Sequence, residues 1–179
     1  MKYLKTFENN EPEKKVRYHD NGNIKVIKYF LNGKYHREDG PAVTVWYEDG
    51  EKYCELYFIN GKYYREDGPA IEEWYEDGQK FIEEYFINNK YHREDGPAVQ
   101  EWYENGKVFR QLYYLHDKTH REDGPAAIYY KKNGKIGNTI YWLNDIRYNR
   151  EDWLEKLKEI NSPHYEEQKK LYEIEKDNL

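Results

Sequence analysis

The chain of 179 residues is poor in the side chains from which a conventional globular core is built. Only 37% of its residues are hydrophobic, against about 45 to 50% in an ordinary globular protein, so a thick single core is excluded. No run approaches the roughly 18 consecutive apolar residues that span a bilayer, and the sequence does not begin with a hydrophobic leader. We therefore expect a cytoplasmic protein that has no membrane partner.

Cysteine and excess positive charge are also lacking. The single cysteine, Cys54, excludes an internal disulfide framework and a zinc site built from several thiolates of one chain. The 29 basic and 35 acidic side chains give a net charge of -6. Nucleic acids and anionic membranes attract clustered positive charge, so this balance disfavours both and favours a protein partner with a basic surface.

Aromatic residues, in contrast, are abundant. The sequence contains 21 Tyr, 6 Phe and 5 Trp, which together make up 18% of the chain. Large rings bury enough area to offset the entropy lost on ordering the backbone. The chain is therefore predicted to be folded despite its low apolar content.

A segment that reads His-Arg-Glu-Asp-Gly-Pro-Ala recurs along the chain. It occupies residues 36–42, 92–98 and 120–126, and a copy that begins with Tyr occupies 64–70, so the spacing is 28 residues. A series of glycines has the same spacing: Gly22, Gly50, Gly78, Gly106 and Gly134. Self-similarity at a fixed period is the signature of a tandem array. We predict 28-residue repeats over 14–149, preceded by a lead-in at 1–13.

Turn residues divide one unit into strands. Residues 42–47 and 52–59 are strand candidates on either side of Asp49-Gly50, a pair that favours a type I′ hairpin turn. Asn60-Gly61 is a second hairpin signal, followed by a short third strand at 62–65 and a turn at 66–69. The sequence therefore predicts an all-β fold, an elongated antiparallel β-hairpin repeat array in the form of a thin meandering sheet or a β-solenoid.

Pairing outward from these turns places aromatic residues opposite one another. Trp46 is expected opposite Tyr53, and Tyr57 opposite Tyr64. Strand alternation would put all four rings on one face, with equivalent pairs in the following units. We therefore expect an aromatic ladder along the array.

The tail, at 150–179, changes to a helical period. Asn149 is a candidate cap for a helix whose stripe is Trp153, Leu154, Leu157 and Ile160. Ser162 is a candidate cap for a second helix. From Glu151 onward there are nine acidic and five basic residues, which gives this segment a charge of -4. We predict a helical C-terminal cap that covers the otherwise open last strand.

The Tyr-Glu-Asp-Gly and Tyr-Phe-Ile-Asn-Gly-Lys stretches resemble the variant MORN repeats of YwqK-type proteins. The His-Arg-Glu-Asp-Gly-Pro-Ala segment resembles repeat proteins that are frequent in bacteriophages and large viruses. The resemblance covers about 136 of the 179 residues. It implies β-hairpin arrays that bind proteins and, in the YwqK-type case, a role as the antitoxin partner of a toxin. It brings no catalytic residue with it.

The recurring His-Arg-Glu-Asp cluster offers a base, a cation and two carboxylates, but a structural role explains it better than catalysis. Equivalent side chains of successive units lie about 10 to 14 Å apart, too far to share a zinc ion. Near-identical copies also give near-identical environments, whereas acid and base catalysis needs contrasting ones. We therefore expect no enzyme activity, no cofactor and no metal. The predicted structural residues are Arg37, Asp39, Gly40, Arg65, Asp67, Gly68, Arg93, Asp95, Gly96, Arg121, Asp123 and Gly124.

Cys54 is interpreted as a half-buried filler rather than a nucleophile. Its expected partner across the hairpin is Val45, and no histidine is predicted close enough to activate it.

The positions that differ between units are the better candidates for a specific function. In the middle of the array they are acidic, and they are predicted to meet a basic groove on a partner protein. The residues of this predicted interface are Glu72, Glu73, Glu83, Glu84 and Glu101. A solvated face that keeps the sheet soluble is the alternative interpretation.

These observations favour a non-enzymatic protein-protein interaction module that masks its target. An antitoxin, or a phage-type inhibitor of a host defence nuclease such as a CRISPR effector, would act in this way. Two other functions remain open. One is a structural repeat protein that self-associates into a homo-oligomer. The other is a single-stranded RNA binder that uses the rings and the arginines.

Overall fold

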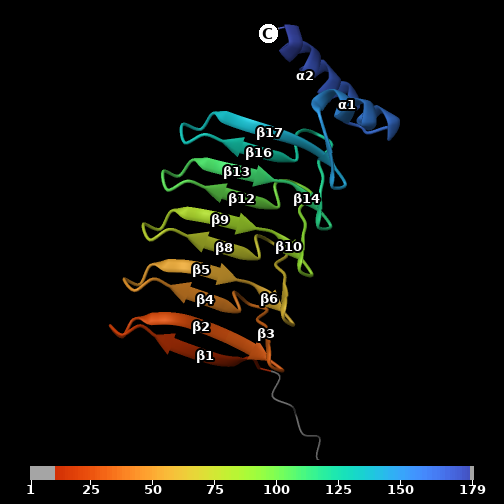
Figure 1. Ribbon diagram of the computed structural model, residues 1–179. Helices are drawn as coiled ribbons and strands as arrows, with labels where there is room; N and C mark the ends of the chain where they lie inside the picture. The colour runs from red at the N-terminus through yellow and green to blue at the C-terminus, as the bar shows by residue number, and fades with distance from the viewer. Residues whose placement is uncertain (1–10, 178–179) are drawn as a thin grey trace, which may run out of the picture.

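In a computed structural model, which describes residues 11–177, the chain forms five long β-hairpins stacked side by side (Figure 1). The strands of these hairpins are β1 (Glu13–Tyr18), β2 (Ile24–Leu31), β4 (Val43–Trp46), β5 (Lys52–Leu56), β8 (Ile71–Trp74), β9 (Lys80–Glu84), β12 (Val99–Trp102), β13 (Val108–Leu112), β16 (Ala127–Tyr130) and β17 (Ile136–Leu143). They belong to one 12-stranded sheet in which each described strand pairs antiparallel with its neighbours. The predicted all-β hairpin fold is therefore confirmed. Of the predicted lead-in at 1–13, residues 1–10 lie outside the described part, and Glu13 already belongs to β1.

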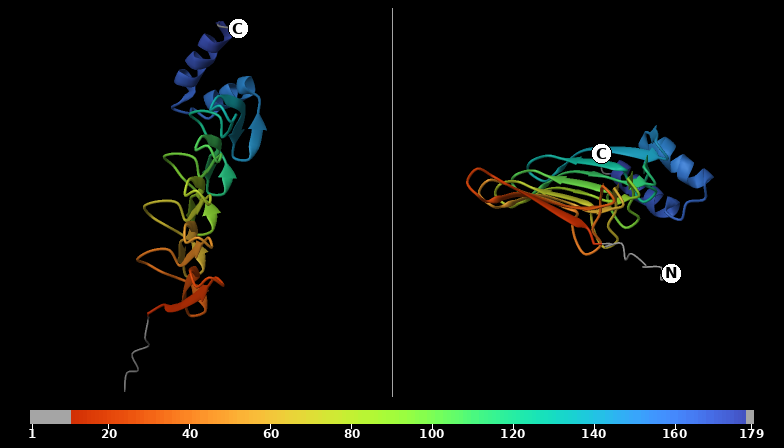
Figure 2. Two further views of the ribbon diagram at one scale, coloured as in Figure 1. Left: turned by 90° about the vertical axis from the view of Figure 1, so that its left-hand side faces the viewer. Right: turned by 90° about the horizontal axis from the view of Figure 1, so that it is seen from below.

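A short hairpin follows each long one, on the side away from the long-hairpin tips (Figure 1). The short strands are β3 (Lys34–Tyr35), β6 (Phe58–Ile59), β7 (Lys62–Tyr63), β10 (Phe86–Ile87), β11 (Lys90–Tyr91), β14 (Tyr114–Leu115), β15 (Lys118–Thr119) and β18 (Ile146–Tyr148). β3 pairs with the end of β2 and β18 with the end of β17, while the others form separate two-stranded sheets. Figure 2 shows the resulting stack from the side and from below.

The short hairpins bury their rings against one face of the sheet, which we call the core face. This face is defined by Val26, Val43, Leu56 and Ile71, against which Phe58 and Phe86 pack. The rings of successive short hairpins form a column: Phe30, Tyr35, Phe58, Tyr63, Phe86, Tyr91 and Tyr114. Adjacent ring centroids lie 4.2 to 5.3 Å apart, within the range of favourable aromatic contacts. This column is the core of the array.

The short hairpins have the turn chemistry that the sequence predicts. Asn60 has a φ of 52° and Gly61 a φ of 77°, so both central residues are left-handed, as a type I′ turn requires. The N–H of Tyr64 donates to the carbonyl of Tyr57 at 3.1 Å, which confirms that predicted pair.

The predicted type I′ turn at the long-hairpin tips is wrong. Of Asp49 and Gly50, only Gly50 has a positive φ, of 99°. Its N–H donates to the carbonyl of Tyr47 at 3.2 Å, and the side chain of Asp49 accepts from the N–H of Glu51. This is a three-residue loop with the glycine in the left-handed bulge position.

The predicted pair of Trp46 and Tyr53 is also wrong, because a β-bulge shifts the register. Trp46 lies opposite Lys52, while Val45 lies opposite Cys54, so Tyr53 is the extra residue. The bulge turns the ring of Tyr53 toward Tyr47, with centroids 5.1 Å apart. The same contact recurs between Tyr75 and Phe81 and between Tyr103 and Phe109. The ladder of paired rings therefore runs through the residue after each tryptophan.

Tyrosine hydroxyls connect neighbouring long hairpins near their tips. Tyr47 donates to the carbonyl of Trp74 at 2.8 Å. Tyr75 donates in the same way to Trp102, and Tyr103 to Tyr130, both at 2.8 Å. These bonds satisfy carbonyls at the bulges, where strand pairing is interrupted.

The helical C-terminal cap is confirmed, with α1 at Arg150–Glu159 and α2 at Tyr165–Asp177. Asn149 caps α1 by accepting from the N–H of Asp152. Trp153, Leu154 and Leu157 are buried against Leu143, but Ile160 is 45% exposed because it lies at the end of the helix. α2 begins three residues after Ser162, later than predicted. Residues 178–179 of the predicted cap lie outside the described part.

The prediction that this cap covers the last strand holds for only one half of it. α1 contacts β18 and the second half of β17 (Figure 1). The indole N–H of Trp153 and the amide of Gln168 donate to the carbonyls of Arg121 and Asp123 in the loop before β16. Ile136 and its neighbours at the start of β17 remain exposed.

If the ring column is the core, removing one of its rings must cost far more than truncating an exposed neighbour. We expect Phe58→Ala, a change at a side chain that is 7% exposed, to lower the free energy of unfolding by about 3 to 5 kcal/mol. Ile87, in the equivalent short hairpin, is 42% exposed, and Ile87→Ala should cost less than about 1 kcal/mol. Urea denaturation followed by circular dichroism measures both. Equal losses for the two variants would contradict this account of the core.

Candidate functional site

The face opposite the core face has no helix or strand packed against it within residues 11–177, and we call it the open face. Strand alternation places Trp46, Glu55, Glu72, Trp74 and Glu83 on it. Its side chains form three stripes that cross the strands. One stripe contains tryptophans, the next contains carboxylates and amides, and the third contains tyrosines that are covered by arginines.

The central stripe brings like charges together. Glu55 pairs with Glu72 across two strands, and Glu72 pairs with Glu83 across the next two. Directly opposed like charges destabilise a sheet unless cations separate them. Lysines and an arginine fill that role. Lys52 lies 2.6 Å from Glu55, Arg65 lies 2.6 Å from Glu72, and Lys80 bonds both Glu72 and Glu83.

The cations of the central stripe also order the tryptophan stripe. The ammonium of Lys52 lies 5.1 Å from the ring centre of Trp74, and that of Lys80 lies 5.8 Å from the same ring. Both separations fall within the range of cation–π attraction. Trp46, Trp74 and Trp102 are half-buried. The rings of the open face are therefore held in place by neighbouring side chains of the same face.

The third stripe is formed by the arginines of the recurring motif. The guanidinium of Arg65 lies 4.1 Å from the ring centre of Tyr57, and its Nε donates to Asp67 at 3.1 Å. Three other arginines make the same two contacts, at 3.8 to 4.3 Å from a tyrosine ring centre and 2.7 Å from an aspartate oxygen. The pairs are Arg37 with Asp39, Arg93 with Asp95, and Arg121 with Asp123. The hydrogen bond from arginine lowers the pKa of Asp39, Asp95 and Asp123.

The glycines of the motif make room for these arginines. A Cβ atom built on Gly68 would lie 2.9 Å from the central carbon of the Arg65 guanidinium. A Cβ atom built on Gly40, Gly96 or Gly124 would lie 3.2, 3.0 or 3.3 Å from the same carbon of the arginine in its own loop. The motif residues thus form one packing unit in each loop.

The histidines of the motif accept hydrogen bonds from backbone N–H groups of the next short hairpin. Nδ1 of His36 accepts from the N–H of Asn60 at 3.1 Å, and His92 accepts from the N–H of His116 at 3.2 Å. His120 accepts from Asn144 in the same way. An imidazole whose lone pair is used in this way is not free to act as a base.

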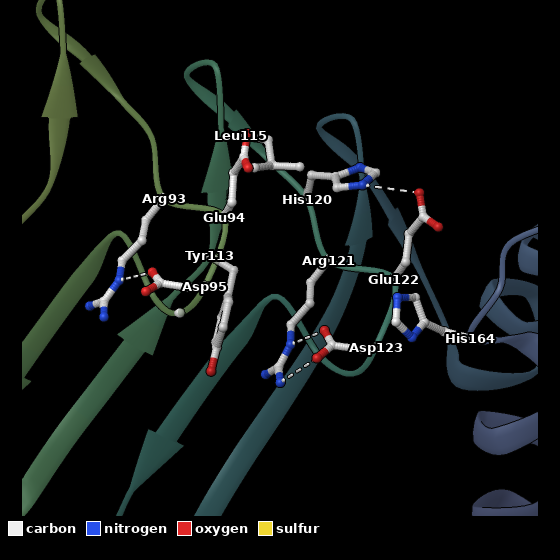
Figure 3. Close-up of a pocket in the computed structure, with 11 residues that line it drawn as sticks. Arg93, Glu94, Asp95, Tyr113, Leu115, His120, Arg121, Glu122, Asp123 and His164 are labelled. Carbon is white, nitrogen blue, oxygen red and sulfur yellow. Dashed lines mark hydrogen bonds and ion pairs between the residues drawn. The ribbon is translucent and has the colours of Figure 1, made fainter. Parts of the chain in front are cut away.

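Shallow clefts separate successive motif loops, and the one nearest the cap is drawn in Figure 3. Its polar groups pair within their own loops: Arg93 with Asp95, Arg121 with Asp123, and His120 with Glu122 at 3.4 Å. His164 of the cap closes one side. Among residues 11–177, no group of three or more His, Cys, Asp or Glu side chains is arranged to hold a metal ion.

Cys54 lies where the sequence places it, opposite Val45 on the core face. It is 5% exposed, and burial raises the pKa of its thiol to about 12. The reactive thiolate is therefore scarce at neutral pH.

The five glutamates of the predicted interface do not form one patch. Glu72 and Glu83 lie on the open face, while Glu73, Glu84 and Glu101 lie on the core face. Most of them are engaged: Glu101 bonds Arg110, and Glu84 accepts from the hydroxyl of Tyr91 at 2.8 Å. Adjacent residues of a strand point to opposite faces, so the sequence already indicates that Glu72 and Glu73 lie on different faces.

The motif loops, for which the sequence predicts a structural role, also carry highly accessible carboxylates. Glu38, Asp67 and Glu94 have side-chain exposures of 84, 85 and 82%.

Compared with known proteins, the chain matches no family model, no curated protein and no solved structure. Within the described part of the chain, no helix is long and apolar enough to cross a membrane.

Glu73 and Glu72 form a matched pair for a test of these environments. Burial and the charge of Glu84 raise the pKa of Glu73, which has no ion-pair partner among the described residues. A carboxyl whose folded pKa is raised destabilises the fold when ionised, and this penalty disappears as the pH falls through the folded pKa. We expect Glu73→Gln to melt higher than the parent at pH 7, with the difference shrinking toward pH 4.

The control is Glu72→Gln, which removes the charge that Arg65 and Lys80 bond. This variant should melt at a lower temperature than the parent at pH 7. Its free energy of unfolding should be lower by roughly 1 to 2 kcal/mol. Thermal melts followed by circular dichroism across the pH range give both values. If Glu73→Gln lowers the melting temperature at pH 7, the assignment of an unpaired, half-buried carboxylate is wrong.

Proposed function

We propose that the protein is a non-enzymatic binding module that masks a target protein with its open face. The observation that supports this proposal is a sheet face on which rings and charges are held in fixed positions by neighbouring side chains and by the arginines of the motif loops. Trp74, for example, lies between Lys52 and Lys80, and each of these lysines is held by a glutamate. Such preorganisation lowers the entropy lost on binding.

The composition of the open face also suits protein recognition. Tryptophan, tyrosine and arginine are the residues that most often dominate binding energy at protein interfaces. On this face they recur at regular spacing over an extended surface, which is how repeat proteins bind large partners. An antitoxin or a phage-type inhibitor of a host nuclease, acting in the cytoplasm, belongs to this class and agrees with the resemblance to YwqK-type repeats.

The alternative of single-stranded RNA binding would use the same rings, but the charge of the motif loops counts against it. Each of Arg37, Arg65 and Arg93 donates to an aspartate two residues later. A guanidinium neutralised in this way contributes little to a phosphate-binding track.

The test is a pull-down of the tagged protein from its native lysate, with and without nuclease, using one variant on each face. We expect the parent to retain one stoichiometric protein after nuclease treatment. Trp74→Ala should lose that protein, because it removes the central ring of the open face. Tyr53→Ala, at a ring that is 38% exposed on the core-face side, should retain it. Circular dichroism melts verify that both variants fold.

Recovery of nucleic acid in place of a protein, abolished by nuclease, would replace the proposal with the RNA-binding alternative. Equal retention of the partner by both variants would show that the open face is not the binding surface.

A further inference from the structure

Three clefts between successive motif loops share one construction. Each has a motif loop on either side, and its floor contains a tyrosine of the third stripe and the aliphatic residue two places after it. Their volumes of about 590, 400 and 440 Å³ lie within the range of small-ligand pockets. In the same order, the floor pairs are Tyr57 with Ile59, Tyr85 with Ile87, and Tyr113 with Leu115.

The corresponding space beyond the last motif loop is filled by the chain itself. Tyr141 and Leu143 stand at the floor positions, 28 residues after those of the neighbouring cleft. The loop at 120–124 is the only wall among the described residues, because the chain enters α1 where another motif loop would follow. Trp153 of α1 lies on this floor. Its ring is 4.8 Å from that of Tyr141, it packs in one cluster with Leu143, and it is fully buried.

The cap also bonds the backbone of this loop. The indole N–H of Trp153 donates to the carbonyl of Arg121 at 3.3 Å, and the side-chain amide of Gln168 donates to the carbonyl of Asp123 at 3.0 Å. A buried indole N–H needs an acceptor, so the first of these carbonyls helps to orient the ring. The loop and floor together therefore suit a side chain that is apolar but carries one N–H group.

The clefts between the earlier loops offer the same groups. The carbonyls of Arg93 and Asp95, which correspond to the two that the cap bonds, accept from no donor within residues 11–177. The aliphatic floor residue is also accessible. Ile87 is 42% exposed, whereas Leu143, at the same place in the last unit, is 4% exposed. The groups that the cap covers in the last unit thus remain available in the units before it.

The last unit differs from the others in one respect that concerns the ligand. Asn149 stands at the position of the motif arginine and caps α1, so no motif arginine stacks on the last tyrosine. In the cleft over Ile87, by contrast, Arg93 stacks on Tyr85, and Arg65 lines the opposite side. A cation attracts the face of a tryptophan ring more strongly than that of tyrosine or phenylalanine. The two guanidinium groups therefore favour an indole as the ligand.

We propose that these clefts bind tryptophan side chains of a partner protein, as the space beside the loop at 120–124 holds Trp153. The indole lies on Ile59, Ile87 or Leu115, and its N–H donates to a carbonyl of the adjoining loop. Because the clefts recur along the array, a partner with two suitably spaced tryptophans gains from the high effective concentration of the second contact. These sites deepen the proposed function, on which they rest for the choice of a protein as partner.

The first test uses the full chain and N-acetyltryptophanamide, so that no target protein is needed. The probe should shift the methyl resonances of Ile59 and Ile87 with a dissociation constant of about 1 to 10 mM, since a single side chain provides little binding energy. Ile24 and Ile136 are exposed outside the clefts and serve as internal controls. N-acetylleucinamide, whose side chain has no N–H, should bind at least about fivefold more weakly.

Three results would each overturn the tryptophan sites. They are an absence of shifts at Ile59 and Ile87 up to about 10 mM probe, equal shifts at the two control methyl groups, and equal affinity for the leucine compound.

A variant of one cleft tests the floor directly. Ile87→Gln removes the aliphatic group at an exposed position, so the fold should be retained. The probe-induced shifts of the Gly68 and Asp95 amides, which belong to the two walls, should disappear, while Ile59 still responds. Lys90→Gln is the matched control, because Lys90 pairs with Ile87 across the short hairpin but does not line the cleft. Retention of the wall shifts in Ile87→Gln would contradict the assigned floor.

Two further outcomes separate these sites from the masking function. Trp74 does not line any of the three clefts, so Trp74→Ala should bind the probe as the parent does. If Trp74→Ala releases a captured target while the parent binds no probe, the masking function stands and the tryptophan sites are wrong. If the methyl signals of Ile59 and Ile87 shift with protein concentration alone, a second copy fills the clefts, and the assignment to a separate partner is wrong.

Discussion

Stacking of aromatic rings on one face of the sheet is the interaction on which the fold depends. The first four short hairpins contribute rings to a column that runs along the array, and Phe58 lies 5.3 Å from Tyr35 on one side and 4.2 Å from Tyr63 on the other. The small residue before each first strand, such as Ala70, is fully buried beneath this layer. Because each ring contacts the ring before and the ring after it, the units are not independently stable. This explains how a chain with 37% hydrophobic residues remains ordered.

Because the core lies on one face of the sheet, the fold does not need another element to pack on the other face. The open face is ordered by contacts within itself, in which cations separate neighbouring glutamates and stack on rings. The two faces therefore have different roles. The core face holds successive hairpins together, and the open face presents rings and charges whose positions are fixed by the sheet. That separation is what makes a binding role physically reasonable for this fold.

The sequence predicted those features that depend on local signals, namely the strands, the Asn60-Gly61 turn and the Asn149 cap. It was wrong at Tyr53 because a glycine bulge and a type I′ turn share the Asp-Gly signal and differ only in the φ of the aspartate. It also grouped Glu72 with Glu73, although their adjacency in a strand separates them. Two features lay beyond local signals. The face covered by the short hairpins and the half of β17 left open by the cap both depend on how distant elements pack.

The two edges of the sheet are protected in different ways. β1 ends the array with charges, which discourage the addition of another strand. The exposed part of β17 carries none, but from Tyr141 onward the same edge is paired with β18, and α1 packs beside both strands. A strand that approached β17 would therefore meet the cap after a few residues. The cap thus limits edge-to-edge association of the array without covering the whole of its last long strand.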